Sequence, residues 1–298
     1  MRSFSAIDKA SILVEALPYI KKFHGKTVVI KYGGNAMINE ELKEAVLKDI
    51  VLMQLVGMRP VVVHGGGPDI NDMLDKMKIE SEFINGQRVT DADAMQVVEM
   101  VLTGKVNSSI VKYLNQDGGE AVGLSGADAN LLVAHKKRTT VTAEDGTEHE
   151  VDLGMVGEVE SVNVDLLNSL LDQGYIPVIS PVAIGARGES YNVNADLAAG
   201  AVAAALKAEK LVLLTDVEGL YRDYKDKTSL ISVLPVRLVE GLKAEGVIAG
   251  GMIPKIDCCV HAVKQGVGSV HILDGRVLHC ILLEVFTREG IGTMVVNK

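Results

Sequence analysis

KYGGN at residues 31–35 and VVVHGGGP at residues 61–68 carry the same pattern twice. In each, an apolar β-branched stretch runs into glycines, and a segment typical of a helix follows. The pattern predicts a strand leading into an anion-binding loop at a helix N-terminus, where glycines bring backbone N–H groups close to the anion. Lys31 adds a cation at the end of the first strand. Two such loops favour a site that holds two anionic groups together, as phosphoryl transfer from a nucleotide to an acidic substrate requires.

The composition predicts a folded protein with a large core. Hydrophobic residues make up 48% of the 298 residues, which argues against disorder. Aromatic residues are only 4%, Trp is absent and the formal net charge is −9, so neither base stacking nor a polyanion-binding surface is expected. We therefore predict no nucleic-acid partner.

The cysteines and the N-terminal residues favour a cytoplasmic protein. Cys258, Cys259 and Cys280 are odd in number and lack metal-ligand spacing, so we expect buried free thiols in a reducing compartment and no metal site. Asp8 and Glu15 stand where a signal peptide would have an apolar core, and no apolar run is long enough to cross a bilayer. These observations predict cytoplasmic localisation and no membrane partner.

The order of the segments predicts an α/β fold. An amphipathic helix at residues 1–24, which Pro18 is expected to bend or interrupt, precedes buried strands that alternate with helices. This alternation favours a three-layer αβα sandwich around a mostly parallel central sheet. Residues 131–163 instead alternate in polarity around Asp145-Gly146, which predicts an antiparallel β insertion.

The same pattern divides the chain into three parts. Residues 1–26 hold the N-terminal helix, which covers its own domain or another subunit. Residues 27–195 form a first lobe and residues 196–298 a second. A cleft between the lobes, at the carboxyl ends of the strands, is the expected site. Helices in the second lobe are expected at residues 195–207, 235–245, 254–265 and 277–283.

Six local motifs, taken together, resemble those of the amino-acid kinase family. They are KYGGNAM at residues 31–37, HGGGP at 64–68, GQRVT at 86–90, NVNAD at 192–196, LTDVEG at 214–219 and GGMIPK at 250–255. The resemblance covers residues 27–298 in the right order. It implies the three-layer fold and the use of ATP. The motifs are most similar to those of the members that phosphorylate the side-chain carboxylate of N-acetyl-L-glutamate in arginine biosynthesis.

The resemblance implies a catalytic set of two lysines and one aspartate. Lys31 would contact the transferring phosphoryl group from the acceptor side, Lys255 would neutralise charge on the nucleotide side, and Asp196 would hold both lysines. Gly34 and Gly66 would donate backbone N–H groups to the phosphoryl group. Because a carboxylate is already a nucleophile, catalysis would depend on positioning and charge neutralisation rather than on a general base.

The resemblance also implies where the substrates would bind. Arg88 and Asn192 would grip the α-carboxylate of the acceptor, for which the planar arginine fork is suited, and Gly65 and Gly66 would line the acceptor site. ATP would lie on the second lobe, with Mg²⁺ bridging its phosphates and few direct protein ligands. The residues expected at the nucleotide are Thr215, Asp216, Gly250, Gly251 and Lys255.

Three residues near these motifs need separate interpretation. Gln87 stands where an apolar residue is usual in the family, and Ala127 stands where a lysine is common. We expect these departures to affect affinity rather than the type of reaction. His64 is expected to be a packed, hydrogen-bonded core histidine rather than a catalyst.

The ends of the chain carry a second resemblance, to arginine-inhibited members of the family. It rests on the N-terminal helix, on HILDGR at residues 271–276 and on GIGTM at residues 290–294. L-Arginine would bind beside His271, Glu284 and Gly290, where the carboxylate suits a guanidinium. The N-terminal helices would interlace dimers into a hexameric ring. Some members bind a PII signalling protein on that ring, and no residue here favours or excludes this partner.

Other functions compete with this interpretation. A dinucleotide-dependent oxidoreductase would need Gly-x-Gly-x-x-Gly after the first strand, and residues 65–68 do not fit that pattern. A sister kinase would act on carbamate, aspartate, glutamate or a nucleoside monophosphate, but Arg88 with Asn192 favours an acceptor that bears a carboxylate. A non-catalytic arginine-sensing protein would have no need of the two lysines and the aspartate together.

Overall fold

The protein is built on one central β-sheet. The computed structural model describes residues 5–37, 39–142, 147–287 and 290–297. The strands of the sheet are β1 (Thr27–Tyr32), β2 (Arg59–His64), β5 (Ala121–Ser125), β10 (Ile176–Ser180), β13 (Lys210–Thr215), β14 (Val233–Pro235), β15 (Ser269–Asp274) and β16 (Thr293–Val296). Their spatial order is β14-β16-β15-β13-β1-β2-β10-β5. Pairing is parallel from β15 to β5, whereas β16 is antiparallel to β15.

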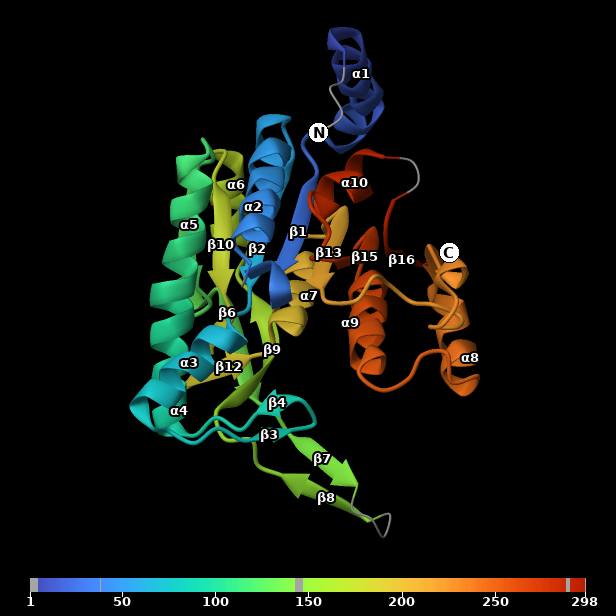
Figure 1. Ribbon diagram of the computed structural model, residues 1–298. Helices are drawn as coiled ribbons and strands as arrows, with labels where there is room; N and C mark the ends of the chain where they lie inside the picture. Colours follow the sequence, from blue (N-terminus) through green and yellow to red (C-terminus); the bar gives the residue numbers. More distant parts are fainter. Residues whose placement is uncertain (1–4, 38, 143–146, 288–289, 298) are drawn as a thin grey trace.

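Helices cover both faces of this sheet (Figure 1). They are α1 (Ala6–Phe23), α2 (Glu40–Leu55), α3 (Gly67–Met77), α4 (Ala92–Glu99), α5 (Asn107–Gln116), α6 (Val164–Asp172), α7 (Ala195–Ala205), α8 (Val239–Ala244), α9 (Met252–Lys264) and α10 (Cys280–Phe286). Short 3₁₀ turns are η1 (Gly34–Met37), η3 (Asp128–Asn130), η4 (Lys227–Ser229) and η5 (Val236–Leu238).

The core consists of two apolar layers, one on each face of the sheet. Val28, Ile30 and Tyr32 of β1 belong to the layer that contains α2, α5 and α10, whereas Val29 belongs to the layer that contains α6, α7 and α9. This alternation follows from the two-residue period of a strand that is buried on both faces. The predicted three-layer αβα sandwich with a mostly parallel sheet is confirmed.

A smaller antiparallel part is attached to the sandwich. A closed barrel contains β6 (Leu132–Lys136), β9 (Val156–Val162), β11 (Val182–Ile184) and β12 (Ser190–Val193). Two hairpins pair β3 (Phe83–Ile84) with β4 (Gln87–Arg88), and β7 (Thr139–Thr142) with β8 (Glu148–Val151). The second hairpin projects from the body (Figure 1). The predicted antiparallel insertion is confirmed, and Asp145-Gly146 lies outside the described residues.

The N-terminal helix α1 stands away from the body and contacts α10 at its base (Figure 1). It begins with a capping box, in which Ser5 and Asp8 exchange hydrogen bonds. The predicted helix is confirmed, but the expectation that Pro18 could break it is wrong, because α1 continues from Ala6 to Phe23. Val14, four residues before Pro18, is 61% exposed, so water can hydrate the carbonyl group that Pro18 leaves without a donor.

Three further segments differ from prediction or add to it. A helix was expected at 235–245, but Pro235 is the last residue of β14 at the sheet edge, where a proline is tolerated. The 3₁₀ turn η5 follows, and α8 starts only at Val239. The helix expected at 277–283 starts at Cys280, because His279 has a left-handed backbone (φ 57°). Between α4 and α5 the helix continues through a π-helical segment, η2 (Met100–Val106), which the sequence did not indicate.

The predicted lobes share the central sheet. β1 of the first lobe lies between β2 of the same lobe and β13 of the second. The predicted boundary at residues 195 and 196 falls in the first turn of α7, and the division into lobes stays a prediction. Among the described residues, no helix is both long and apolar enough to span a bilayer.

Candidate active site

Three neighbouring strands end side by side at one edge of the sheet. Tyr32 at the end of β1 is paired with His64 at the end of β2, and Lys31 is level with Leu213 of β13. The two glycine loops and the turn after β13 therefore leave the sheet next to one another. This is the carboxyl edge of the parallel strands, where ligands of open α/β sheets bind.

At this edge, Asp196 lies between two lysines. Its Oδ1 atom is 3.0 Å from the Nζ atom of Lys31, and its Oδ2 atom is 3.4 Å from the Nζ atom of Lys255. Asn194 caps α7 and places Asp196 in the first turn of that helix. Lys255 lies in the first turn of α9, where its charge opposes the helix dipole, so this position does not serve helix stability.

The charge of this cluster is positive. Burial acts to raise the pKa of Asp196, but the two neighbouring ammonium groups hold that pKa below its usual value. The carboxylate is therefore ionised at neutral pH and balances only one of the two lysines. All three side chains are partly exposed, between 13% and 21%. One net positive charge thus faces the solvent at the carboxyl edge, where it can meet an anion.

One glycine in each loop is closely approached by a neighbouring side chain. A Cβ atom at Gly34 would lie 2.7 Å from Oδ1 of Asp216, and Gly34 has φ +70°. A Cβ atom at Gly66 would lie 2.6 Å from Cδ2 of Leu102, in the π-helical segment. Gly66 is the N-cap residue of α3, which has no side-chain cap, so backbone N–H groups at this helix start remain available to a ligand.

The second glycine loop opens into a cavity of about 200 Å³. Its lining includes Gly65, Gly66, Arg88 and Asn192, the residues predicted at the acceptor. The rest of its lining is apolar or uncharged: Gly67, Ile70, Phe83, Gly86, Gln87, Leu102, Val156, Pro181, Val193, Asn194 and Ala195. In the part of the chain that the structure describes, no acidic side chain lines this cavity.

Arg88 is fixed in the cavity wall by neutral partners. Its guanidinium donates to Oδ1 of Asn71 at 2.5 Å and to the hydroxyl of Ser81, and it stacks 4.6 Å from the centre of the Phe83 ring. Within the described residues, no carboxylate forms an ion pair with Arg88. A positioned cation without an acidic partner favours an anionic ligand.

Apart from Lys255, the residues predicted at the nucleotide lie at the end of β13 and at the start of α9. Asp216 follows β13 and lies against Gly34. Thr215 turns its hydroxyl toward its own loop, where the group donates to the carbonyl of Val217 at 3.2 Å. Gly250 and Gly251 are exposed at the start of α9, one turn before Lys255. Among the described residues, no group of three His, Cys, Asp or Glu side chains could hold a metal ion.

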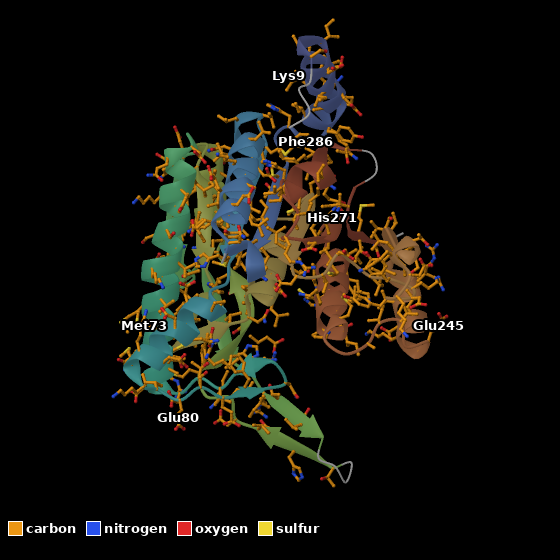
Figure 2. The ribbon with its side chains drawn as sticks, viewed as in Figure 1. Lys9, Met73, Glu80, Glu245, His271 and Phe286 are labelled. Atoms are coloured by element: carbon orange, nitrogen blue, oxygen red, sulfur yellow. The ribbon has the colours of Figure 1, made fainter. Side chains whose placement is uncertain are left out.

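A second cavity, of about 240 Å³, lies at the base of α1. His271, Glu284 and Gly290 line it, together with Phe23 of α1 and Lys210 of β13. Figure 2 shows His271 beneath α10, on the side of the molecule from which α1 extends. The three residues predicted at an arginine site are therefore brought together, although they are spread over residues 271–290 of the chain.

A buried hydrogen-bond chain sets the charges in this second cavity. His271 contacts Oε1 of Glu284 through Nδ1 at 2.6 Å and Nζ of Lys210 through Nε2 at 2.9 Å. Burial lowers the pKa of His271, so its ring is neutral, donates from Nδ1 to Glu284 and accepts from Lys210 at Nε2. Burial also lowers the pKa of Lys210, to about 8. The cavity thus presents a carboxylate and an ammonium group a short distance apart.

Comparison with known proteins now decides the family. The sequence matches the amino acid kinase family over residues 26–274. The chain belongs to the amino acid kinase family. It is 60% identical to the acetylglutamate kinase of Heliobacterium modesticaldum over 292 residues, 98% of this chain and 99% of that protein. It is 57% identical to the acetylglutamate kinase of Moorella thermoacetica over 294 residues, 99% of each chain.

Solved structures agree with this assignment of the fold. The N-acetylglutamate synthase from Neisseria gonorrhoeae, complexed with coenzyme A and N-acetyl-glutamate, superposes on this amino acid kinase with a TM-score of 0.82 at 27% identity. The match covers 99% of this chain, which spans only 64% of the synthase. The Giardia carbamate kinase shares the fold alone, with a TM-score of 0.67 at 17% identity over 92% of this chain.

The sequence of this amino acid kinase did not reveal every residue of its sites. Asn107 and Lys210 were not predicted as residues of either site. Asn107 shares the buried face of α5 with Ile110 and Leu114, and this helical spacing was an available signal. Lys210 is 8% exposed, and a lysine at the start of the apolar run KLVLL was an available signal. Gln87 lines the acceptor cavity, and its buried Oε1 atom has no hydrogen-bond partner among the described residues.

Proposed function

We propose that this amino acid kinase transfers the γ-phosphoryl group of ATP to the side-chain carboxylate of N-acetyl-L-glutamate. The observation that carries the proposal is the cluster of Lys31, Asp196 and Lys255 between the two glycine loops. The curated relatives named acetylglutamate kinase, which match over nearly the whole chain, support the choice of acceptor. In the reaction a carboxylate oxygen forms a bond to the γ-phosphorus, the bond to the bridging oxygen breaks, and ADP leaves.

Charge neutralisation is the main task of the site in this proposal. Lys31 contacts the transferred group from the acceptor side, Lys255 neutralises charge on the nucleotide side, and Asp196 holds the two ammonium groups in place. The backbone N–H groups of Gly34 and Gly66 donate to the phosphoryl oxygens. Donors fixed before the reaction stabilise charge that spreads in the transition state, and one such donor contributes about 10²–10³ in rate.

The nucleotide is proposed to lie beside Asp216 and the start of α9. Because the described residues hold no group of three metal-ligating side chains, Mg²⁺ would take most of its ligands from the phosphates. When bound, the ion would neutralise phosphate charge.

The acceptor cavity supports an N-acylated amino acid rather than a free one. Arg88, which has no acidic partner among the described residues, would bind the α-carboxylate together with Asn192. A free amino acid would bring an ammonium group beside Arg88, and no acidic side chain in the described lining could pair with it. An acetamido group carries no charge and fits the uncharged lining. Leaving a charge buried and unpaired costs several kcal/mol, about 10²-fold or more in affinity.

An acceptor panel tests this proposal. Purified protein is given ATP and Mg²⁺ with N-acetylglutamate, glutamate or aspartate, and the acyl phosphate is trapped with hydroxylamine. Carbamate is followed in parallel by ADP release. We expect turnover with N-acetylglutamate and at least about 100-fold lower kcat/KM with the other acceptors. Preferred use of glutamate, aspartate or carbamate would contradict the assigned acceptor, and no turnover with any of them would contradict the kinase activity.

We also propose that L-arginine inhibits this enzyme by binding in the cavity at the base of α1. A free arginine carries a cationic side chain and an anionic carboxylate. The cavity offers Glu284 to the first and Lys210 to the second. Gly290 lets the chain approach Glu284, because a Cβ atom there would lie 2.7 Å from its Oε2 atom. The Glu284→Gln variant should need at least about 10-fold more arginine for half inhibition, whereas the exposed Glu240→Gln control should not.

Assembly into a hexamer through α1 is the remaining part of the proposal. Ile7, Leu13, Val14 and Leu17 of α1 are all more than half exposed, which is unusual for large apolar side chains on one helix. A helix that packs against another copy would bury them. Deletion of residues 1–24 should reduce the hexamer to smaller species in light scattering and weaken inhibition by arginine. A deleted chain that remains hexameric and fully sensitive would contradict this part.

A further inference from the structure

His64 is completely buried directly before the second glycine loop, and it has no role in the reaction proposed above. Its Nδ1 atom is 2.9 Å from the carbonyl oxygen of Gly65, and its Nε2 atom is 3.1 Å from Nδ2 of Asn107. The same Asn107 amide donates to the carbonyl of Val178, at 2.8 Å, in β10. A continuous buried chain of hydrogen bonds thus leads from the sheet to the backbone of the glycine loop.

The direction of this chain follows from its donors. One hydrogen of the Asn107 amide points at the carbonyl of Val178, at 2.8 Å. The other points toward Nε2 of His64, at 3.1 Å, with the carbonyl of Leu124 farther away at 3.5 Å, so Nε2 of the ring must accept. The ring hydrogen is then on Nδ1, from which it points at the carbonyl oxygen of Gly65. Burial lowers the pKa of His64 to about 4, in agreement with a neutral ring at physiological pH.

A hydrogen bond at the Gly65 carbonyl determines where the next N–H points. In a trans peptide the C=O and N–H groups point in opposite directions, and the structure has no cis peptide bonds among its described residues. Holding the Gly65 carbonyl toward the buried histidine therefore turns the N–H of Gly66 the opposite way, away from His64. Gly66 lines the acceptor cavity, and its N–H group belongs to the start of α3.

We propose that His64 and Asn107 are positioning residues, which aim the Gly66 N–H group at the transferred phosphoryl group. Neither touches a substrate; both act through the peptide between Gly65 and Gly66. The inference rests on the function proposed above, because it assigns the aimed N–H to the phosphoryl group of that reaction.

The π-helical segment lies next to this pair. It ends at Val106, so Asn107 is the first residue after it, and Asn107 shares the buried face of α5 with Ile110 and Leu114. A Cβ atom at Gly66 would lie 2.6 Å from Leu102 and 3.3 Å from Val106, both in the same segment. The segment therefore packs against Gly66 and leads directly into Asn107, which contacts His64. π-Helical turns are frequent at functional sites.

Two variants of His64 that carry an amide side chain distinguish a positioning role from a general structural role. Asn places its amide near the position of Nδ1 and can still donate to Gly65, whereas Gln places it near the position of Nε2 and cannot. We expect His64→Asn to keep kcat within about 10-fold of the wild type and His64→Gln to lower kcat by about 10²-fold. Because Arg88 and Asn192 would still bind the acceptor, KM for N-acetylglutamate should change less than kcat in both variants.

The outcomes distinguish this inference from the proposed function. Thermal unfolding of both variants monitors the fold, and wild-type protein in the hydroxylamine assay reports whether the reaction itself occurs. Equal losses of kcat in the two folded variants, or losses confined to KM, would overturn the positioning role while leaving the kinase in place. An inactive wild type would overturn the proposed function instead.

A measurement on the unaltered protein keeps the inference testable if the variants do not fold. ¹⁵N NMR of histidine-labelled wild-type enzyme reports which ring nitrogen carries the hydrogen. The His64 ring should be neutral with its hydrogen on Nδ1 at pH 7. A hydrogen on Nε2 would mean that the ring cannot hold the Gly65 carbonyl, and the proposed aiming of the Gly66 N–H would be wrong.

Discussion

Replacement of Asp49 by asparagine should change how the stability of the protein depends on pH. Asp49 of α2 is fully buried, and its Oδ1 atom is 2.6 Å from Nδ1 of His279. The backbone N–H groups of Ile281 and Leu282, at the start of α10, also act to lower the pKa of Asp49. Its Oδ2 atom has no hydrogen-bond partner within the described chain. Burial outweighs these interactions and raises the pKa of Asp49 to about 6.

The magnitude follows from this shift of the pKa. From an ordinary value of 3.8 the shift is about two units, and at 1.36 kcal/mol per unit it corresponds to roughly 3 kcal/mol. Below about pH 4 the Asp49 carboxyl is protonated in both the folded and the unfolded protein, and its contribution to the free energy of unfolding is fully present. As the pH rises toward 6, the unfolded chain ionises while the folded protein holds its proton, so stability is lost. About 2 kcal/mol of this loss falls between about pH 4.5 and 7.5.

Urea denaturation of the wild type and of Asp49→Asn across this pH range is the assay. His64 titrates in an overlapping range with the opposite effect, because burial lowers its pKa to about 4 and its stabilisation is lost as the pH falls. The difference in free energy of unfolding between the two proteins removes that contribution. It should shift by about 2 kcal/mol in favour of Asp49→Asn as the pH rises from about 4.5 to 7.5.

A matched substitution shows whether the effect belongs to the buried site. Asp117 is exposed, so Asp117→Asn should give a difference curve that stays nearly flat over the same range. If the curve for Asp49→Asn is equally flat, then Asp49 is ionised in the folded protein and the reasoning from burial is refuted.

Two further predictions concern the acceptor cavity. Gly66→Ala should lower the free energy of unfolding by about 1–3 kcal/mol, because its Cβ atom would lie 2.6 Å from Leu102; urea denaturation should show no such loss for Gly67→Ala, where nothing lies within 4 Å of the added carbon. Arg88→Lys should raise KM for N-acetylglutamate at least about 10-fold, because an ammonium group cannot replace the fork held by Asn71 and Ser81. Steady-state kinetics of Arg88→Lys beside the exposed Arg187→Lys would reveal an unchanged KM, which would contradict the proposed role of Arg88.

The sandwich could be predicted from the sequence because its signals are local. β-Branched runs such as residues 27–30 and 61–63 precede glycines and then helical periodicity, and in the structure they lie in neighbouring parallel strands. Parallel pairing places every carboxyl end at one edge, so the glycine loops had to meet. The grouping of Lys31 with Asp196 and Lys255 was predicted only through the family resemblance, since no spacing along the chain relates them.

What could not be predicted depends on contacts distant in sequence. The π-helical turn before Asn107 leaves no mark in the sequence pattern. Its backbone hydrogen bonds join residues five apart instead of four, within a helix that is otherwise regular. Pro18 does not interrupt α1, one of its two expected effects, because that helix extends into solvent, where a carbonyl group can do without a protein donor. Asp49 appears in the sequence as an ordinary helix carboxylate, and only the packing of α10 against α2 buries it.

The rate of phosphoryl transfer in Lys31→Ala tests the central claim most directly. Lys26→Ala is the matched control, because Lys26 precedes the same strand at its opposite end and its side chain is 52% exposed. With saturating ATP and N-acetylglutamate, Lys31→Ala should lower kcat by about 10²–10³-fold, while calorimetry shows acceptor binding within about 10-fold of the wild type. Lys26→Ala should match the wild type in both measurements. A Lys31→Ala enzyme that turns over at the wild-type rate would contradict the account.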